Sequence, residues 1–149
     1  MIALVQRVLR GSVTVAGETV GNIGPGMVVL AAVEKGDTAA EAEWVAGKLA
    51  GLRIFRDQAG QKHFDRDVTQ IGGAILLVSN FTVAAQTAKG RRPSLDGAAS
   101  PEEGRVLFEK LVELVRGRGI PTATGRFGAD MQVEIVNDGP ATFVVKSGS

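Results

Sequence analysis

The first third of the chain consists of short apolar stretches separated by glycine-containing turns. Val13 and Val15 alternate with polar neighbours, which is the period of a half-buried strand. Residues 27–33 are continuously apolar, as in a strand that is buried on both faces. The pattern predicts a β-meander with strands at residues 2–9, 12–16, 19–23 and 27–33.

The next segment combines a helix-start signal with helical spacing of apolar residues. Thr38 and Glu41 have the spacing of a capping box, in which each side chain satisfies a free backbone amide at the helix start. We therefore expect a helix that runs to about Gly51. Its expected apolar face consists of Trp44, Val45, Leu49 and Leu52, together with the stem of Lys48.

A second helix is expected after residue 100. Ser100 and Glu103 again have capping-box spacing, and Pro101 occupies the first helical position, where its missing N–H costs nothing. The helix should run to about Arg118 and stop at Gly119. Its apolar face is expected to contain Leu107, Leu111, Leu114 and Val115.

Further strands complete the prediction. Residues 74–78 form the most apolar run and should be a buried strand, and Asn137 to Thr142 has the composition of a hairpin turn between two apolar segments. The chain contains no internal repeat, linker or low-complexity tract. We therefore expect a single α+β domain over residues 1–149, with two helices and additional strands at 52–56, 61–64, 131–136 and 143–145.

Composition narrows the possible chemistry. The 149 residues include no cysteine, which excludes disulfides and thiolate metal sites. The net charge of +1 argues against a generally basic, nucleic-acid-coating surface, although it permits a local basic patch. No apolar run approaches the roughly 20 residues that span a bilayer, and the start of the chain reads as a strand rather than a signal peptide. We expect a cytoplasmic protein without a membrane segment.

Few side chains are available for acid and base chemistry. The only histidine, His63, lies in a predicted polar hairpin, and no cysteine can pair with it. Asp65-Arg66-Asp67 lacks the length and the final glutamate of a calcium loop, and no phosphate-binding loop is present. We expect no metal and no cofactor. If the chain is an enzyme, its substrate should already be reactive, with backbone amides stabilising a developing oxyanion.

Two short stretches stand out once these possibilities are removed. Ser79-Asn80-Phe81-Thr82 ends the buried strand, where small polar groups can line a pocket or merely satisfy backbone groups. Asn137-Asp138-Gly139-Pro140-Ala141-Thr142 is either a plain hairpin loop or part of a site. Neither stretch is specific alone.

Read together, the two stretches resemble the signature motifs of the D-aminoacyl-tRNA deacylases, Ser-Gln-Phe-Thr and Asn-Xaa-Gly-Pro-Val-Thr. The similarity extends to the start of the chain and to collinear blocks across it. These blocks are Met1 to Val8, Arg92-Pro93-Ser94, Gly97 to Pro101, Thr124 to Phe127 and Ala129 to Val133.

This resemblance implies a compact β-barrel-like domain with helices outside, working as a homodimer with its active sites at the interface. It further implies that Gly139-Pro140, joined by a cis peptide bond, enters the partner's active site and faces Ser79 to Thr82. The carbonyls of this segment would hold the substrate's ammonium group and exclude an L side chain, with Arg7 as their anchor. Glycyl-tRNA, mischarged on tRNA-Ala for example, should therefore be tolerated.

The resemblance also implies the reaction and its partner. Water would hydrolyse the ester of D-aminoacyl-tRNA, with backbone amides near Phe81 and Thr82 stabilising the oxyanion, and Thr82 as a less favoured nucleophile. Phe81 would contact the terminal adenine. Candidates for contacts with phosphates of the acceptor end are Lys89, Arg91, Arg92 and Arg126.

The sequence departs from the family pattern at four positions: Asn80 replaces the usual glutamine, Val83 and Ala141 replace larger apolar residues, and Leu95 stands where an aromatic is frequent. Three alternatives remain at this stage. They are a non-catalytic tRNA-binding module, a related deacylase of L-alanine mischarged on tRNA with a trans Gly-Pro bond, and a structural dimer that binds no aminoacyl-tRNA.

Overall fold

The computed structural model describes residues 1–148, and its sheet is built around the 14-residue strand β1 (Ile2–Val15), which pairs with three other strands. The first half of β1 pairs with β3 (Gly26–Ala32), and the second half pairs with β2 (Glu18–Ile23). The expected break near residue 10 and the simple meander are therefore wrong. Strand β1 continues because Gly11 is paired on both sides, with Ile23 and with Ile135.

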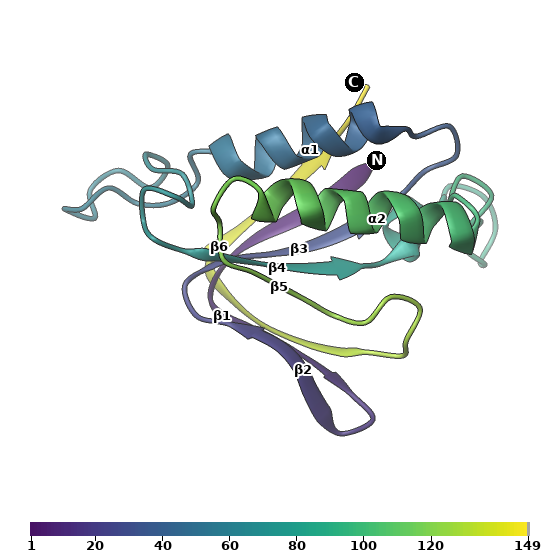
Figure 1. The fold of residues 1–149 in the computed structure, drawn as a ribbon, viewed down its shortest axis with the longest axis horizontal. Helices are drawn as coiled ribbons and strands as arrows, with labels where there is room; N and C mark the ends of the chain where they lie inside the picture. The colour runs from purple at the N-terminus through teal and green to yellow at the C-terminus, as the bar shows by residue number, and fades with distance from the viewer. Residues whose placement is uncertain (149) are drawn as a thin grey trace.

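The remaining strands extend and curl this sheet. Strand β4 (Ala74–Ser79) runs parallel to β3, β5 (Thr122–Thr124) runs parallel to β4, and β6 (Gln132–Lys146) lies antiparallel to β1. The order is β2-β1-β3-β4-β5, with β6 on β1. The two ends of this order approach each other, since a Cβ added at Gly21 of β2 would overlap the Thr124 carbonyl of β5. The sheet is thus nearly a closed barrel, which confirms the expected barrel-like fold (Figure 1).

Helices α1 (Ala39–Gly51) and α2 (Pro101–Arg116) lie side by side over one face of the sheet (Figure 1). The capping box of α1 is confirmed: Ala40 N–H donates to Thr38 Oγ1 over 3.3 Å, and Thr38 N–H donates to Glu41 Oε2 over 2.6 Å. At α2, Glu103 N–H donates to the Ser100 hydroxyl. Helix α2 ends two residues earlier than expected, at Arg116, and a 3₁₀ helix, η1 (Phe81–Ala84), was not expected.

The apolar face of α1 differs from the prediction at one position. Trp44 is 41% exposed, with the Lys48 ammonium 5.5 Å from its ring centre, whereas Val45 and Leu49 are fully buried as expected. The small side chains of Ala42 and Ala46 fill the buried face instead. They leave no room there for an indole ring.

Strand β1 divides the core into two parts. Ala3 and Val5 point toward the helices and join the larger apolar cluster, which includes Leu49 and Leu111. A second, smaller apolar cluster packs inside the barrel, and both Val8 and Val13 of β1 belong to it because the register of β1 shifts between its two halves. The buried members of this smaller cluster are Val8, Val13, Val28, Leu76 and Val78.

Two predicted hairpins are also corrected. Residues 52–64 form no strand, and the β-type pairing of this segment is limited to one isolated bridge between Phe55 and Arg66. The expected C-terminal hairpin is instead the single strand β6. Between the pairs Gln6↔Thr142 and Val8↔Asn137, two steps along β1 face five along β6, so the Gly-Pro segment bulges from the strand. Among residues 1–148, no helix has the length and apolar character to cross a bilayer.

We predict that Leu111→Ala destabilises the protein by about 2–5 kcal/mol, because it removes a fully buried side chain between α2 and the sheet. Urea unfolding measures the loss. On the same helix, Val106 is 60% exposed, and Val106→Ala should change the free energy of unfolding by no more than about 0.5 kcal/mol. Equal effects of the two substitutions would contradict this placement of the core.

Candidate active site

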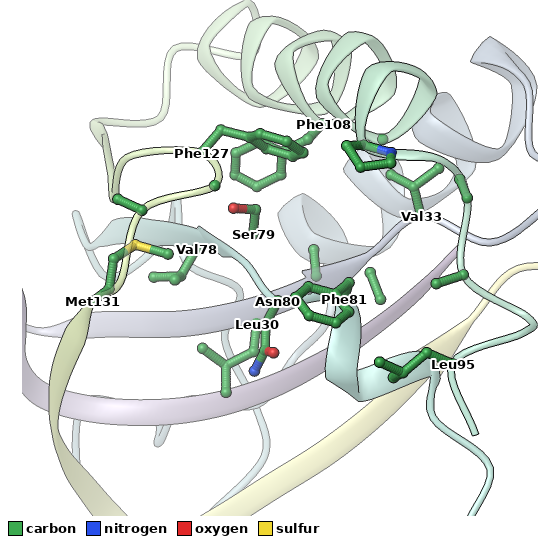
Figure 2. Close-up of a pocket in the computed structure, with 18 of the residues that line it drawn as sticks. Leu30, Val33, Val78, Ser79, Asn80, Phe81, Leu95, Phe108, Phe127 and Met131 are labelled. Carbon is green, nitrogen blue, oxygen red and sulfur yellow. The ribbon is translucent and has the colours of Figure 1, made fainter. Parts of the chain in front are cut away.

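A pocket of about 880 Å³ opens at the carboxyl ends of the parallel strands β3 and β4 (Figure 2). Ligands commonly bind at this edge of parallel strands. The remaining walls come from the 95–101 loop, the first turns of α2 and residues 127–135. Most of the lining side chains are apolar, which favours a ligand that is itself partly apolar.

The first signature motif lies in the wall of this pocket. Ser79, Asn80 and Phe81 line it, and Thr82 is exposed beside it. The motif is fixed by Asn80 N–H, which donates to the Ala31 carbonyl over 2.8 Å. The next residues form the 3₁₀ helix η1, which begins at Phe81. The first amides of a helix have no hydrogen-bond acceptor within that helix, and here these amides belong to Phe81 and Thr82. This geometry leaves backbone donors at the edge of the pocket.

The Thr82 hydroxyl already has a partner. It donates to the Asn80 side-chain oxygen over 2.5 Å. An amide oxygen does not take up the hydroxyl proton as a base would, so the contact positions Thr82 without activating it. Asn80, whose side chain is one methylene shorter than the glutamine usual in the family, therefore holds Thr82 in place within the motif.

Aromatic rings form the opposite wall of the pocket, and this was not foreseen from the sequence. Phe108 of α2 and Phe127 lie with ring centres 6.0 Å apart (Figure 2). The Arg105 guanidinium lies 4.8 Å from the Phe127 ring centre. Phe108 has helical spacing with Leu111, and this spacing predicts that its side chain is buried. It does not predict that Phe108 lines a pocket, because a buried helical residue can face either the core or a ligand site.

The second signature motif lies on the bulge of β6. Gly139 and Pro140 are exposed and joined by a cis peptide bond. Asn137 supports the bulge from within, because its side-chain amide donates to the carbonyls of Arg7 and Ala141, each over 2.9 Å.

Arg7 anchors the bulge from below and is only 3% exposed. Its Nε donates to the Asp138 carbonyl over 3.0 Å, and its Nη1 donates to the carbonyls of Ile54, over 2.8 Å, and His63, over 3.1 Å. Burial, and then the nearby Arg56 guanidinium, lower the pKa of Arg7, while Asp138 raises it. An arginine stays protonated under such shifts, so it remains a permanent donor to three carbonyls.

Comparison with known proteins agrees with this pairing of motifs. A sequence profile of the D-Tyr-tRNA(Tyr) deacylase family matches residues 4–146. A D-aminoacyl-tRNA deacylase from Geobacter sulfurreducens is 54% identical over 100% of this chain and 97% of its own length. One from Methylococcus capsulatus is 52% identical over 98% of this chain and 94% of its own length.

This chain belongs to the D-Tyr-tRNA(Tyr) deacylase family. It is thus a hydrolase, as the sequence predicted. The solved structure of c-Myc DNA Unwinding Element Binding Protein superposes with a TM-score of 0.94 at 39% identity, covering 100% of both chains. That of a probable eukaryotic D-amino acid tRNA deacylase superposes with a TM-score of 0.78, covering 97% of this chain and 98% of the other. At 17% identity this second likeness concerns the fold alone.

In this deacylase, one chain does not bring its two motifs together. Arg7, below the bulge, pairs with Met27, which in turn pairs with Ile75 of β4. Ser79 lies four residues further along β4, about 13 Å at the usual rise per strand residue, and two strands away from β1. The Gly-Pro bulge therefore lies away from the pocket of its own chain.

The other candidate residues of the deacylase lie outside the pocket wall. Lys89, Arg91 and Arg92 are exposed on the loop that follows η1, and Arg126 is exposed next to the wall residue Phe127. The expected polar position of His63 is confirmed: it is exposed, is absent from the described pocket lining, and uses its backbone carbonyl to accept a bond from Arg7.

We predict that Arg7→Met destabilises the deacylase by about 3 kcal/mol, because three carbonyls lose a charged donor in a buried place. Urea unfolding measures this loss. Arg10 is the matched control, since it lies on the same strand and forms an ion pair with Glu134 of β6 in which each side chain is 65% exposed. Arg10→Met should cost less than about 1 kcal/mol. If the two variants lose the same stability, Arg7 is not the anchor described above.

Proposed function

We propose that this chain hydrolyses the ester bond of D-aminoacyl-tRNA, releasing a free D-amino acid and tRNA. The observation that carries the proposal is the pocket that Ser79, Asn80 and Phe81 line at the carboxyl ends of parallel strands, in a chain of this family. Aminoacyl esters are reactive toward water, so the site needs orientation and oxyanion stabilisation more than a strong base.

The amides of Phe81 and Thr82 are the proposed oxyanion donors. Water attacks the ester carbonyl, the carbonyl oxygen becomes negative, and the two N–H groups stabilise that charge. The ester bond to the ribose oxygen then breaks, and the oxygen leaves with a proton as the terminal hydroxyl of tRNA. The neighbouring ribose hydroxyl can assist as part of the substrate, and the Thr82 hydroxyl, bonded to Asn80, is not needed as a nucleophile.

Chiral selection is assigned to the backbone of Gly139 and Pro140. Their carbonyls hold the α-ammonium group of the substrate and occupy the space that an L side chain would need. The exposure of both residues and their anchoring by Arg7 support this role. Glycine has no side chain to exclude, so glycyl-tRNA, including tRNA-Ala mischarged with glycine, is also a proposed substrate.

A second copy of the chain must supply this segment, since each chain holds its own bulge away from its own pocket. The barrel-side face of β1 and β6 fits such a copy. Val144 is 66% exposed there and pairs with Leu4, which pairs with the pocket residue Leu30. This apolar surface is therefore continuous with the pocket, and covering it in a homodimer would place the bulge of one chain near the pocket of the other.

The basic loop and the exposed rings suggest how the acceptor end of tRNA is bound. Phe81 is 59% exposed at the pocket wall and can contact the terminal adenine. Lys89, Arg91, Arg92 and Arg126 are proposed to contact phosphates, which requires only a local positive patch on a nearly neutral chain. We place this activity in the cytoplasm, where aminoacyl-tRNA is made and used.

The direct test measures hydrolysis of D-tyrosyl-tRNA and L-tyrosyl-tRNA by the purified protein. We expect rapid release from the D ester, with the L ester lost only at its uncatalysed rate. L-alanyl-tRNA is a third substrate in the same assay. Hydrolysis of only the L-alanyl ester would support a different specificity on this fold, and binding of tRNA without hydrolysis would support a binding module.

A complementation experiment tests the composite site. Gly104→Leu should block the pocket, because Gly104 lines it and a Cβ there would already be in van der Waals contact with the Phe127 ring, at 3.6 Å, so the rest of a leucine side chain must occupy pocket space. Gly139→Val should disable the bulge, because Gly139 has φ +136° and a Cβ there would lie 3.0 Å from Arg7 Nη2. In a mixed dimer with one variant on each chain, one site keeps an intact pocket and an intact bulge, so about half of the D-specific activity should remain.

The control dimer carries both substitutions on one chain and none on the other. If the bulge serves the partner's pocket, each site of this dimer has one damaged part, and activity should be lost. Activity in the control dimer together with inactivity of the first would mean that each chain forms its site alone. Gel filtration of both dimers confirms that assembly is unchanged.

A further inference from the structure

The carboxylate of Asp138, the residue just before Gly139, lies between two guanidinium groups. Its Oδ2 is 2.6 Å from Nη1 of Arg56 and 3.5 Å from Nε of Arg7. The Asp138 side chain is 24% exposed, and that of Arg56 is 34% exposed. A charge-assisted contact of this length, partly shielded from water, is stronger than a solvated surface pair.

Arg56 is itself held in place by its own segment. Its carbonyl accepts a bond from Arg66 Nε over 2.7 Å, and the neighbouring Phe55 exchanges backbone hydrogen bonds with Arg66. Phe55 is 5% exposed and packs in the helix-side core. Arg56 therefore reaches the bulge from a segment that is fixed to the core.

The two cations need the carboxylate between them. Burial, and then repulsion by the Arg56 guanidinium, lower the pKa of Arg7, while Asp138 raises it. The Asp138 carboxylate thus offsets the repulsion that Arg7 experiences from Arg56, which it contacts directly at 2.6 Å. Arg7 holds the Asp138 carbonyl, and Arg56 holds its carboxylate. With both the main chain and the side chain of Asp138 fixed, the direction in which the chain enters Gly139 is set from two sides.

We propose that Arg56 and Asp138 are positioning residues for chiral selection, because their ion pair fixes the orientation of the Gly139-Pro140 backbone. This inference rests on the proposed function. Arg56 does not touch the substrate; it acts through Asp138 on the carbonyls that reject an L side chain. A looser bulge admits L esters more readily and holds the ammonium group of D esters less well.

The test compares kcat/KM for D-tyrosyl-tRNA and L-tyrosyl-tRNA in Arg56→Gln, Asp138→Asn and the double variant. Each single variant should lower the D-to-L ratio at least about tenfold, as expected for losing a charge-assisted bond. The double variant should be no worse than Asp138→Asn alone, because both substitutions remove the same contact. Arg56→Lys, which keeps the charge and one donor, should recover part of the ratio.

Arg10→Gln is the matched control, with the same change of charge in the exposed pair between β1 and β6. It should leave the ratio unchanged. A general loss of stability would lower the activity on both esters without changing their ratio, so a ratio that stays at the wild-type value in both Arg56→Gln and Asp138→Asn would overturn the inference.

Hydrogen exchange of the backbone amides of residues 137–142 provides a readout that does not depend on activity. Exchange of these amides should be faster in Arg56→Gln than in Arg10→Gln. Equal exchange rates would contradict the proposal that Arg56 fixes the bulge. If the wild-type protein hydrolyses neither ester, the proposed function fails, while the exchange rates still decide whether Arg56 and Asp138 hold the bulge.

Discussion

The buried guanidinium of Arg7 connects the parts of the molecule on which the site depends. A buried charge must be paired and hydrogen-bonded, and here the partners are carbonyls from two segments far apart in sequence, at Ile54 and His63 on one side and Asp138 on the other. Because guanidinium donors point in fixed directions, the three acceptors are held in a fixed relation to strand β1. The irregular 52–66 segment and the bulge of β6 are thereby tied to the regular sheet.

The same strand organises the opposite face. Alternate residues of β1 point to the helix-covered core and to the barrel side, so Arg7 and Val5 lie on one face while Leu4 and Gln6 lie on the other. The helices cover the first face. On the second face, apolar surface at Leu4 and Val144 continues into the pocket, and in the proposed dimer the partner covers it. In that proposed dimer, the bulge is anchored by Arg7 in its own chain and presented at the partner's site.

Short sequence patterns correctly predicted the structural elements that are stabilised by interactions between neighbouring residues. The Thr38–Glu41 capping box predicted the start of α1 because both partners lie within one helical turn. Signals that depend on distant partners were misread. The composition of residues 137–142 is typical of a hairpin turn, but the strand continues on both sides of it because β1 supplies ladder partners before and after the bulge. Trp44 was misplaced because helical spacing identifies an apolar face without revealing how closely the helix approaches the sheet.

The two signature motifs were recognisable, whereas their supports were not. Ser79 to Phe81 stood out as polar and aromatic groups at the end of a buried strand. The Arg56–Asp138 contact joins residues 82 positions apart, and no spacing rule predicts it. The proposed function gives a physical reason why the motifs were recognisable while the residues that support them were not. A site that excludes L-aminoacyl esters by contact with main-chain atoms distinguishes substrates only by the configuration at the α-carbon. It can therefore accept D residues with many different side chains. Its selectivity then depends on how rigidly that main chain is held, and distant side chains determine that rigidity.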